Sequence, residues 1–406
     1  MTSPLPLSGS QLLSRFQALD GFLCEHQALW RPRPFTQLEL PWEAEHPDLA
    51  GWLRQRSLSE AEAVHNDPGQ LDAPAPFPQL ARMAAALSAV GELPSMALPA
   101  ASQRLNVDVP GRKWQQIEAF ASHLGFIHSP RHWLDWCAGK GHLGRRLLQP
   151  HSQQLTCLEY DPTLVKAGIA LSQHHHLPAE HHLQDVLAED AALHLNAGHT
   201  AVALHACGDL HVRLMQLASR QGCRQLAIAP CCYNRIQAPR YQPLSTAAKT
   251  SSLQLSIDDL GLPLSETVTA GARVRRQRDE SMARRLGFDL WQRQLRGVND
   301  YLPTPSLAVS WLQKPYADYC LGLAQLKGLP VGAEPDWHTL ETAGWQRLAQ
   351  VRNLELLRNL FRRPLELWLV LDRALFLQEQ SYEVQLGVFC EQPLTPRNLL
   401  LLAERR

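Results

Sequence analysis

The sequence predicts an α/β fold built on an open, mainly parallel β-sheet. Between residues 130 and 230, short apolar segments alternate with segments of helical periodicity, as parallel strands joined by crossover helices require. The first of these strands runs directly into a glycine-rich turn, and two apolar segments joined by a short polar one close the chain. These observations predict a Rossmann-like sheet of seven strands that ends in an antiparallel hairpin.

The glycine-rich turn has the features of a cofactor-binding loop. The apolar segment 133–136 is followed by the candidate cofactor contacts Cys137, Ala138, Gly139, Lys140 and Gly141. Gly139 and Gly141 allow the backbone to approach a ligand, and a helix that begins near His142 directs free N–H groups at an anionic group. A second strand, Gln154–Glu159, places the Glu159 carboxylate, next to Tyr160, where it can bind a ribose diol.

Two cofactors fit this turn. Gly139–Gly144 matches G-x-G-x-x-G, the dinucleotide fingerprint, and Glu159 lies near the offset of the ribose-binding acid in dinucleotide enzymes. Asp135, four residues before the first glycine, favours S-adenosylmethionine, because class I methyltransferases commonly carry an acidic residue there. The apolar segments Glu383–Cys390 and Asn398–Ala403 support the same cofactor, since an antiparallel hairpin closes a methyltransferase sheet. The dinucleotide remains the alternative.

Helical segments surround this core in the sequence. Helical periodicity is found before residue 110 and in the long stretch that follows the fifth strand. Later strands are predicted at 182–185, 200–205 and 225–229, and a helix at 365–380. The predicted regions are a helical N-terminal region (1–110), the first part of the core (111–235), a helical insertion for substrate recognition (236–363) and the end of the core (364–406).

The composition narrows the class of protein without choosing a function. Lys plus Arg and Asp plus Glu both number 39, so any contact with nucleic acid must come from a local patch. Nine cysteines at irregular spacing argue against a disulfide framework and for a reducing compartment. The first residues lack the pattern of a signal peptide, and no apolar run is long enough to span a bilayer. A cytoplasmic protein without a membrane contact is expected.

The chemistry is expected where the strands end, because ligands of open parallel sheets bind beyond the carboxyl edge. Asp185 ends the predicted third strand, Val186 follows it, and both are candidate contacts of the cofactor. His205 and Ala206 end the fourth strand and are also predicted to contact the cofactor. The candidate catalytic residues are His205, Cys207 and Asp209 after the fourth strand and Cys231, Cys232 and Tyr233 after the fifth.

Four motifs resemble a known group of proteins. They are Asp135-x-Cys-Ala-Gly-Lys-Gly141, His205-Ala-Cys-Gly-Asp209, Cys231-Cys-Tyr233 and Pro396-Arg-Asn398. These segments are similar to the methyltransferase-like family that includes proteins named for a ribosomal-RNA adenine dimethylase domain. The histidine and cysteine segments are more distantly similar to tRNA 2′-O-methyltransferases that act on the acceptor stem. The resemblance covers roughly residues 111–235 and 365–406.

The resemblance implies a class I methyltransferase fold, S-adenosylmethionine as cofactor and a preference for RNA. By position, Asp135, Gly139, Gly141 and Glu159 fall on the cofactor pattern, and Asp185 is the expected adenine contact. One residue departs from the pattern of the class: Cys137 occupies a position where a first glycine is common, which puts the tightness of the turn in question.

Three interpretations of the cysteines are open. A thiolate of Cys207, Cys231 or Cys232 could add to a pyrimidine ring, as in 5-methylcytosine enzymes. His205, Cys207, His211, Cys231 and Cys232 could instead form a metal site, although the paired C-x-x-C spacing of structural zinc sites is absent. The cysteines could also pack as small apolar residues beside the cofactor, and on this ground no metal is expected.

If the cysteines only pack, other residues must orient the methyl acceptor. Asp209 is the first candidate to accept or orient a proton of a hydroxyl or amine, with His205 second. Tyr233 is a candidate to stack on a target base. The alternative role for Asp209 is to cap the helix that begins at residue 210.

A local basic segment suggests the partner. Residues Arg273 to Arg296 contain eight arginines and have helical character, which favours contact with an RNA backbone; a solvated helix face is the alternative. We therefore expect an S-adenosylmethionine-dependent methyltransferase that acts on RNA, either tRNA or rRNA. A protein substrate, or a cofactor-binding protein or dehydrogenase without methyl transfer, remains open. The sequence does not indicate an oligomeric state.

Overall fold

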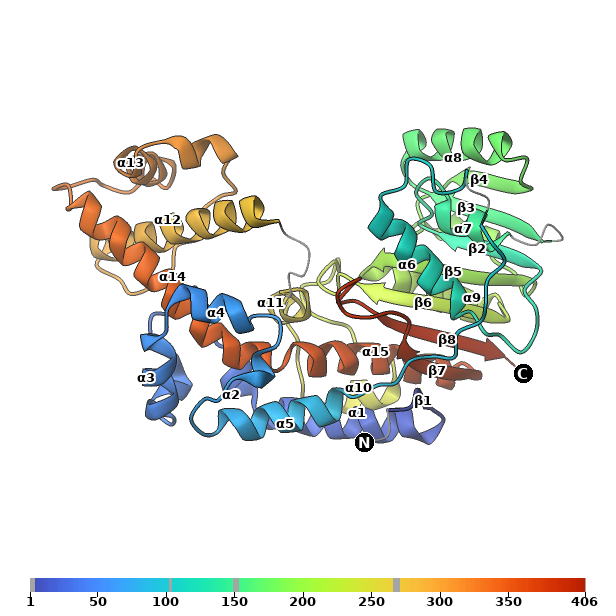
Figure 1. Cartoon of the computed structure of the whole chain (residues 1–406), viewed down its shortest axis with the longest axis horizontal. Coiled ribbons are helices and arrows are strands. Elements are labelled where there is room, and N and C mark those ends of the chain that lie inside the picture. Colours follow the sequence, from blue (N-terminus) through green and yellow to red (C-terminus); the bar gives the residue numbers. More distant parts are fainter. Residues whose placement is uncertain (1–3, 102–103, 149–152, 266–270, 406) are drawn as a thin grey trace. The chain divides into compact units, whose positions relative to one another are not determined.

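The computed structural model describes residues 4–101, 104–148, 153–265 and 271–405. The chain forms two compact units (Figure 1). Unit 1 comprises residues 1–24, 87–264 and 363–406, and unit 2 comprises residues 25–86 and 265–362. None of the helices in the described ranges combines the length and the apolar composition needed to cross a bilayer.

Unit 1 is built on a mixed β-sheet, whose described strands lie in the order β1-β7-β8-β6-β5-β2-β3-β4. The strands are β1 (Leu7–Ser8), β2 (His132–Trp136), β3 (Gln154–Glu159), β4 (Ala179–Leu183), β5 (His199–Cys207), β6 (Gln225–Cys231), β7 (Tyr382–Val388) and β8 (Leu399–Arg405). Strands β2 to β6 are parallel to one another, and β8 lies antiparallel between β6 and β7. The predicted parallel sheet and its closing hairpin are confirmed.

Two details of the sheet differ from the prediction. The structure adds an eighth strand, β1, which pairs antiparallel with β7. Its two residues are too few to produce an alternating pattern that sequence analysis can detect. The third predicted strand, 182–185, is shifted: β4 ends at Leu183, and Asp185 lies in the loop beyond it.

Helices connect the strands of unit 1. They are α1 (Ser10–Glu25), α6 (Gly111–Ser122), α7 (His142–Leu147), α8 (Pro162–His174), η3 (Glu189–His194), α9 (Asp209–Arg220), α10 (Thr246–Thr250), α11 (Ile257–Leu260), η4 (Leu262–Leu264) and α15 (Arg362–Glu379). Every residue of β6 is buried, as expected for a strand covered on both faces. Helices α7, α8 and α9 connect successive parallel strands. The carboxyl ends of these strands therefore lie at the same edge of the sheet, which is where the site forms.

Helix α15 confirms the predicted long helix and explains the charged pair within its apolar run. Asp372 and Arg373 are both buried. The Asp372 carboxylate accepts hydrogen bonds from the Tyr241 hydroxyl (2.5 Å) and from the backbone N–H groups of Leu244 (2.9 Å) and Ser245 (2.7 Å). Arg373 also donates to the Tyr241 hydroxyl, at 3.0 Å. The pair thus fixes the chain that follows β6 against α15.

Unit 2 is helical in the residues that the structure describes. Its elements are α2 (Gln27–Trp30), η1 (Pro41–Glu43), α3 (Pro47–Gln55), α4 (Leu58–Val64), η2 (Pro68–Gln70), most of α5 (Phe77–Ser88), α12 (Ala272–Arg296), η5 (Val309–Gln313), α13 (Tyr316–Leu326) and α14 (Trp337–Asn359). Helix α14 packs on α12 through Leu348 and Val351, which contact Ala283 and Leu286. Gly344 of α14 meets the α12 backbone where a Cβ would clash with Ala283, so the two helices approach closely there.

The two units do not follow the predicted regions. Residues 1–24 and 87–110 of the predicted N-terminal region belong to unit 1, and residues 25–86 belong to unit 2. The predicted insertion is also divided: its residues up to 264 belong to unit 1, and residues 265–362 belong to unit 2. Contacts between segments that are distant in sequence create this division, and composition along the chain does not reveal such contacts.

Candidate active site

The loop between β2 and α7 forms a tight turn in which three residues adopt left-handed backbone conformations. The φ angles are 58° at Cys137, 59° at Gly139 and 72° at Gly141. The turn thus forms with cysteine at the position in question, although a non-glycine residue costs about 1–3 kcal/mol in such a conformation. Backbone strain held at a ligand-binding edge is typical of functional sites.

The two glycines of the turn are needed for different reasons. A Cβ at Gly141 would lie 2.8 Å from the ring of His181, so this position is closed by packing. A Cβ at Gly139 would meet no described atom within 4 Å, so the backbone there faces open space. Gly139 therefore presents bare backbone on the side where the sequence analysis expects a ligand.

Asp135 lies beneath this turn. Its side chain is 2% exposed, and Oδ2 accepts a hydrogen bond from the backbone N–H of Gly144 at 2.9 Å. Burial raises the pKa of Asp135 to about 7, and the Gly144 N–H and the nearby Arg145 only partly oppose that effect. Asp135 thus fixes the start of α7 to the end of β2, and a direct contact with the cofactor remains a prediction.

The raised pKa of Asp135 predicts a specific dependence of stability on pH. Between the unfolded pKa near 4 and the folded pKa near 7, the folded chain holds a proton that the unfolded chain releases, so the free energy of unfolding falls as pH rises through that range. In Asp135→Asn this contribution is absent. The free energy of unfolding of the variant relative to the wild type should rise by about 2 kcal/mol from pH 5 to pH 7. Chemical denaturation of both proteins at the two pH values measures it, and a constant difference would contradict the assignment.

Glu159 connects the turn to the end of β3. Its Oε2 accepts a hydrogen bond from the Gly139 N–H (2.8 Å), and Oε1 accepts from the N–H groups of Tyr160 (2.9 Å) and Asp161 (3.0 Å). A carboxylate offers about four acceptor positions, so one remains on Oε2. The ribose contact predicted for Glu159 has a free acceptor position there and stays a prediction.

The remaining predicted cofactor contacts surround this edge. Tyr160 follows Glu159 and is 72% exposed, an unusual exposure for an aromatic ring. Asp185 is exposed, and its Oδ1 accepts a hydrogen bond from the Leu187 N–H at 2.9 Å; Val186 is buried. The loop after β4 is therefore held in a turn, with a carboxylate available at the surface.

A second group of residues lies where β5 and β6 end. A bulge interrupts the pairing of these strands between Leu204 and Cys207. His205, within the bulge of β5, has a φ angle of 65°, and Cys232, directly after β6, has a φ angle of 46°; both are left-handed non-glycine residues. The thiols of Cys207 and Cys231 lie 3.6 Å apart, and the three Sγ atoms of Cys207, Cys231 and Cys232 lie within 4.8 Å of one another. The structure thus brings together the three cysteines that the sequence analysis selected.

The three thiols differ in acidity. The neighbouring Cys207 and Cys231 thiols lower the pKa of Cys232, and the positive charges of Arg235 and Arg397 lower it further. The pKa values of Cys207 and Cys231 are raised. Cys207 and Cys232 are half-buried, whereas Cys231 is buried. Cys232 is therefore the first of the three to form a thiolate.

The two predicted histidine ligands do not join the cysteines. His211 is buried, its Nδ1 donates to the carbonyl of Ala206 at 2.9 Å, and its Nε2 accepts from Arg373 at 2.7 Å. The Nε2 of His205 lies 2.9 Å from Gln116 Oε1. The five-residue metal set considered from the sequence is therefore wrong, because one of its histidines has both ring nitrogens engaged.

Two side-chain roles proposed from the sequence also need correction. Gly208, not Asp209, is the N-cap of α9, and the Asp209 carboxylate accepts a hydrogen bond from the Gln237 N–H at 2.7 Å. The ring of Tyr233 is fully buried, and its hydroxyl donates to Glu366 at 3.3 Å. Stacking of Tyr233 on a base is therefore wrong, since no face of the ring is accessible.

Gln116 of α6 is a site residue that the sequence analysis missed. Its amide oxygen contacts His205, and its amide nitrogen donates to the carbonyl of Leu394 at 3.0 Å. Arg112 donates to the same carbonyl at 2.8 Å. These bonds join α6, the end of β5 and the connection between β7 and β8. Nothing in the pattern of the helix distinguishes Gln116 from its neighbours, because the partners come from distant segments.

Comparisons with known proteins agree with this geometry. A family model described as a methyltransferase domain matches residues 112–239. A search of curated proteins finds no match. The strand order of unit 1 without β1 is that of a class I methyltransferase sheet, with the antiparallel strand β8 between β6 and β7. The dinucleotide interpretation of the glycine-rich turn is therefore set aside, whereas the narrower resemblance to the dimethylase-domain family stays a prediction.

Similar solved structures include three methyltransferases. TrmK of M. capricolum in complex with S-adenosyl-homocysteine is 12% identical with a TM-score of 0.22, and the match covers 32% of this chain and 51% of that one. An S-adenosylmethionine-dependent methyltransferase from Clostridium acetobutylicum is 15% identical with a TM-score of 0.21, covering 31% and 52%. The plantazolicin methyltransferase BpumL is 12% identical with a TM-score of 0.24, covering 44% and 59%. The chain spans about half the length of each of these proteins.

Proposed function

We propose that this chain, in which residues 112–239 are a methyltransferase domain that uses S-adenosylmethionine, methylates RNA. The observation that carries the choice of RNA is a pocket in unit 2 lined by three arginines. Arginine pairs with phosphate through two parallel hydrogen bonds, and phosphate is present at every nucleotide of RNA. The tRNA or rRNA substrate expected from the sequence is part of this proposal.

Residues at the ends of the strands perform the chemistry. Bound S-adenosylmethionine supplies an electrophilic methyl group on a positively charged sulfur. Glu159, Gly139 and Asp185 hold the cofactor at the ends of β2, β3 and β4, and the ends of β5 and β6 hold the methyl acceptor. Because both are fixed, alignment of the acceptor atom with the methyl group provides most of the acceleration.

His205 and Asp209 orient the acceptor and its proton. Gln116 Oε1 can only accept a hydrogen bond, so His205 Nε2 carries the proton and Nδ1 is the basic nitrogen. Burial lowers the pKa of His205, which keeps the ring neutral at pH 7 and able to accept a proton. The bond from Gln237 occupies one carboxylate oxygen of Asp209, and the other can orient a hydroxyl or amine of the acceptor.

The structure limits which arginines of the segment 273–296 are available to RNA. The last four hold the fold of unit 2: Arg284 and Arg285 donate to backbone carbonyls, Arg293 pairs with Asp289, and Arg296 bonds to Gln292. The first three, Arg273, Arg275 and Arg276, are exposed on the first turns of α12. We therefore restrict the proposed RNA contact to the first turns of α12.

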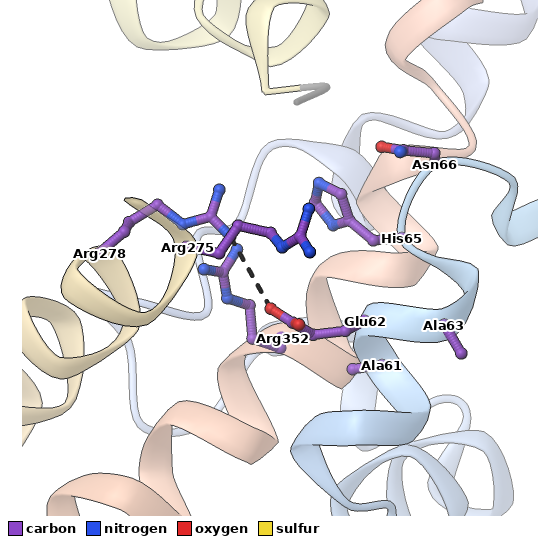
Figure 2. A pocket seen from close by; sticks show the side chains of 8 residues that line it. All are labelled: Ala61, Glu62, Ala63, His65, Asn66, Arg275, Arg278 and Arg352. Carbon is purple, nitrogen blue, oxygen red and sulfur yellow. Dashed lines mark ion pairs between the residues drawn. The ribbon is translucent and has the colours of Figure 1, made fainter. Parts of the chain in front are cut away.

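The pocket lies beside these exposed turns (Figure 2). Its volume is about 370 Å³, and its lining residues are Ala61, Glu62, Ala63, His65, Asn66, Arg275, Arg278 and Arg352. Figure 2 shows Arg275 and Arg278 extending from α12, Arg352 from α14, and Glu62 from α4. Glu62 pairs with Arg278 at 3.9 Å and is the single carboxylate in the lining.

The electrostatics of the pocket favour an anion. Arg352 is 7% exposed and donates to Asp279 at 2.7 Å, but among the described residues its Nε has no hydrogen-bond partner. Burial and the nearby Arg362 and Arg352 lower the pKa of His65 to about 3, so this ring is neutral at pH 7. The three guanidinium groups are opposed by Glu62 in the lining and by Asp279, which pairs with Arg352 and Arg278, so the formal charge of the group is still positive and favours a backbone phosphate.

The double variant Arg275→Gln/Arg278→Gln tests the choice of RNA. We expect RNA affinity to fall about tenfold or more at 0.15 M salt, and the slope of log affinity against log salt to become shallower by about 1. S-adenosylmethionine affinity and the unfolding temperature of unit 1 should not change. Arg82→Gln, at an exposed arginine of α5 outside the pocket, is the matched control. Unchanged RNA affinity and salt dependence in the double variant would remove the support for RNA and favour a protein acceptor.

A further inference from the structure

We propose that Cys207, Cys231 and Cys232 form a zinc site with three sulfur ligands. The separations fit this metal: the Cys207 and Cys231 Sγ atoms lie 3.6 Å apart, and all three Sγ atoms lie within 4.8 Å of one another. Sulfurs at 2.3 Å from a tetrahedral zinc ion are about 3.8 Å apart, so the cluster needs only a small contraction to bind it.

The backbone around the cluster is arranged to bring the thiols together. The bulge after Leu204 shifts the register of β5 so that Cys207 is paired with Cys231 of β6. Cys232 adopts a φ angle of 46°, a conformation that costs a non-glycine residue free energy. Cys207 and Cys232 are only half-buried, whereas cysteines that merely pack as small apolar residues are usually enclosed in the core.

A nucleophilic cysteine explains the cluster less well. Such a residue needs one thiolate directed at the substrate and a neighbouring base, whereas here three thiol sulfurs lie against one another. Three thiolates around Zn²⁺ carry a net charge of −1, and the positive charges of Arg235 and Arg397 act on Cys232. The charge of the filled site would therefore be partly neutralised.

The site would be open rather than closed. Among the described residues, no further histidine, cysteine or carboxylate completes the group. Three protein ligands and a vacant fourth position are typical of catalytic zinc, whereas structural zinc has four protein ligands. The vacant position would bind water or a nucleophilic atom of the methyl acceptor, beside the cofactor. Zinc binding itself does not depend on the identity of the acceptor.

Metal analysis of the full-length chain tests the site. Protein purified under reducing conditions without chelator should contain about one zinc ion per chain, and replacement by Co²⁺ should produce thiolate-to-cobalt charge-transfer absorption. Cys207→Ser, Cys231→Ser and Cys232→Ser should each lower zinc affinity at least about 100-fold, since even changes beyond the direct ligands cost 10–100-fold. Cys24→Ser, at a cysteine of α1, is the matched control and should bind zinc normally.

A second measurement uses the wild-type chain, so it tests the site even if the variants fail to fold. Of the nine cysteines in the wild-type chain, zinc should protect three from alkylation, and peptide mass spectrometry should identify them as Cys207, Cys231 and Cys232. A chain that takes up no zinc at micromolar free metal, or that shows no such protection, would overturn the proposal, as would a Cys207–Cys231 disulfide in the reduced preparation. Because these measurements do not require methyl transfer, failure of the RNA proposal would leave their outcome unaffected.

Discussion

Replacement of Glu159 by alanine should weaken binding of S-adenosylmethionine by at least about 100-fold. Two losses combine: the carboxylate oxygen left for a ribose hydroxyl disappears, and the Gly139 N–H loses the acceptor that holds the turn. A hydrogen bond to a charged group contributes about 1.5–3 kcal/mol, which corresponds to roughly 10- to 150-fold in affinity, and loosening of the turn adds to it. Isothermal titration with the cofactor or with S-adenosylhomocysteine measures the change.

Two control variants make this result specific. Glu383→Ala removes an exposed carboxylate from β7 and should leave cofactor affinity within about twofold of the wild type. Glu159→Gln keeps the length of the side chain but replaces one acceptor oxygen by a donor, so it should recover little affinity. A Glu159→Ala variant that binds the cofactor within threefold of the wild type would show that the ribose lies elsewhere.

Replacement of Asp372 by alanine should lower the free energy of unfolding of unit 1 by about 3–5 kcal/mol, because the change leaves several buried partners without an acceptor. The carboxylate accepts from the Tyr241 hydroxyl and from the N–H groups of Leu244 and Ser245, all inside the core. Arg373, which is buried and donates to the same Tyr241 hydroxyl, would keep its charge in the core. Asp372→Asn keeps one acceptor oxygen and should cost less.

Hydrogen exchange is the suitable measurement, since unfolding of a two-unit chain is not a single transition. The most protected amides of β7 and β8 report the global unfolding of unit 1. The free energy of exchange of these amides should fall by about 3–5 kcal/mol in Asp372→Ala. Protection in α14 of unit 2 serves as the internal reference. A loss below 1 kcal/mol would mean that the network around Asp372 does not stabilise the fold.

Local patterns in the sequence were sufficient to predict the backbone structure at the edge where the cofactor is expected. The turn at Gly139 and Gly141, the acid at Glu159 and the closing hairpin all depend on residues within one or two adjacent elements. The long helix predicted at 365–380, which is α15 in the structure, was also predictable because its apolar run is long. Such features are set by backbone conformation and periodicity, which short stretches of sequence specify.

Features that depend on partners from distant segments could not be predicted. Tyr233 looked accessible beside two cysteines, but Glu366 of α15 and the core around it bury the ring. Arg285 and Arg293 looked available to RNA, but carbonyl groups of other loops bind them. Gln116 carries no local signal at all. In each case the environment comes from a segment far away in the chain, and one sequence does not identify that segment.

Methyl transfer from radiolabelled S-adenosylmethionine into an extract of cells that lack this protein tests the central claim most directly. The labelled products are divided and treated with ribonuclease or with protease. We expect the label to be incorporated and to be lost on ribonuclease treatment, and Arg275→Gln/Arg278→Gln to incorporate less of it than Arg82→Gln. Label that survives ribonuclease and is lost only on protease treatment would contradict an RNA substrate, and absence of label would contradict methyl transfer by this chain.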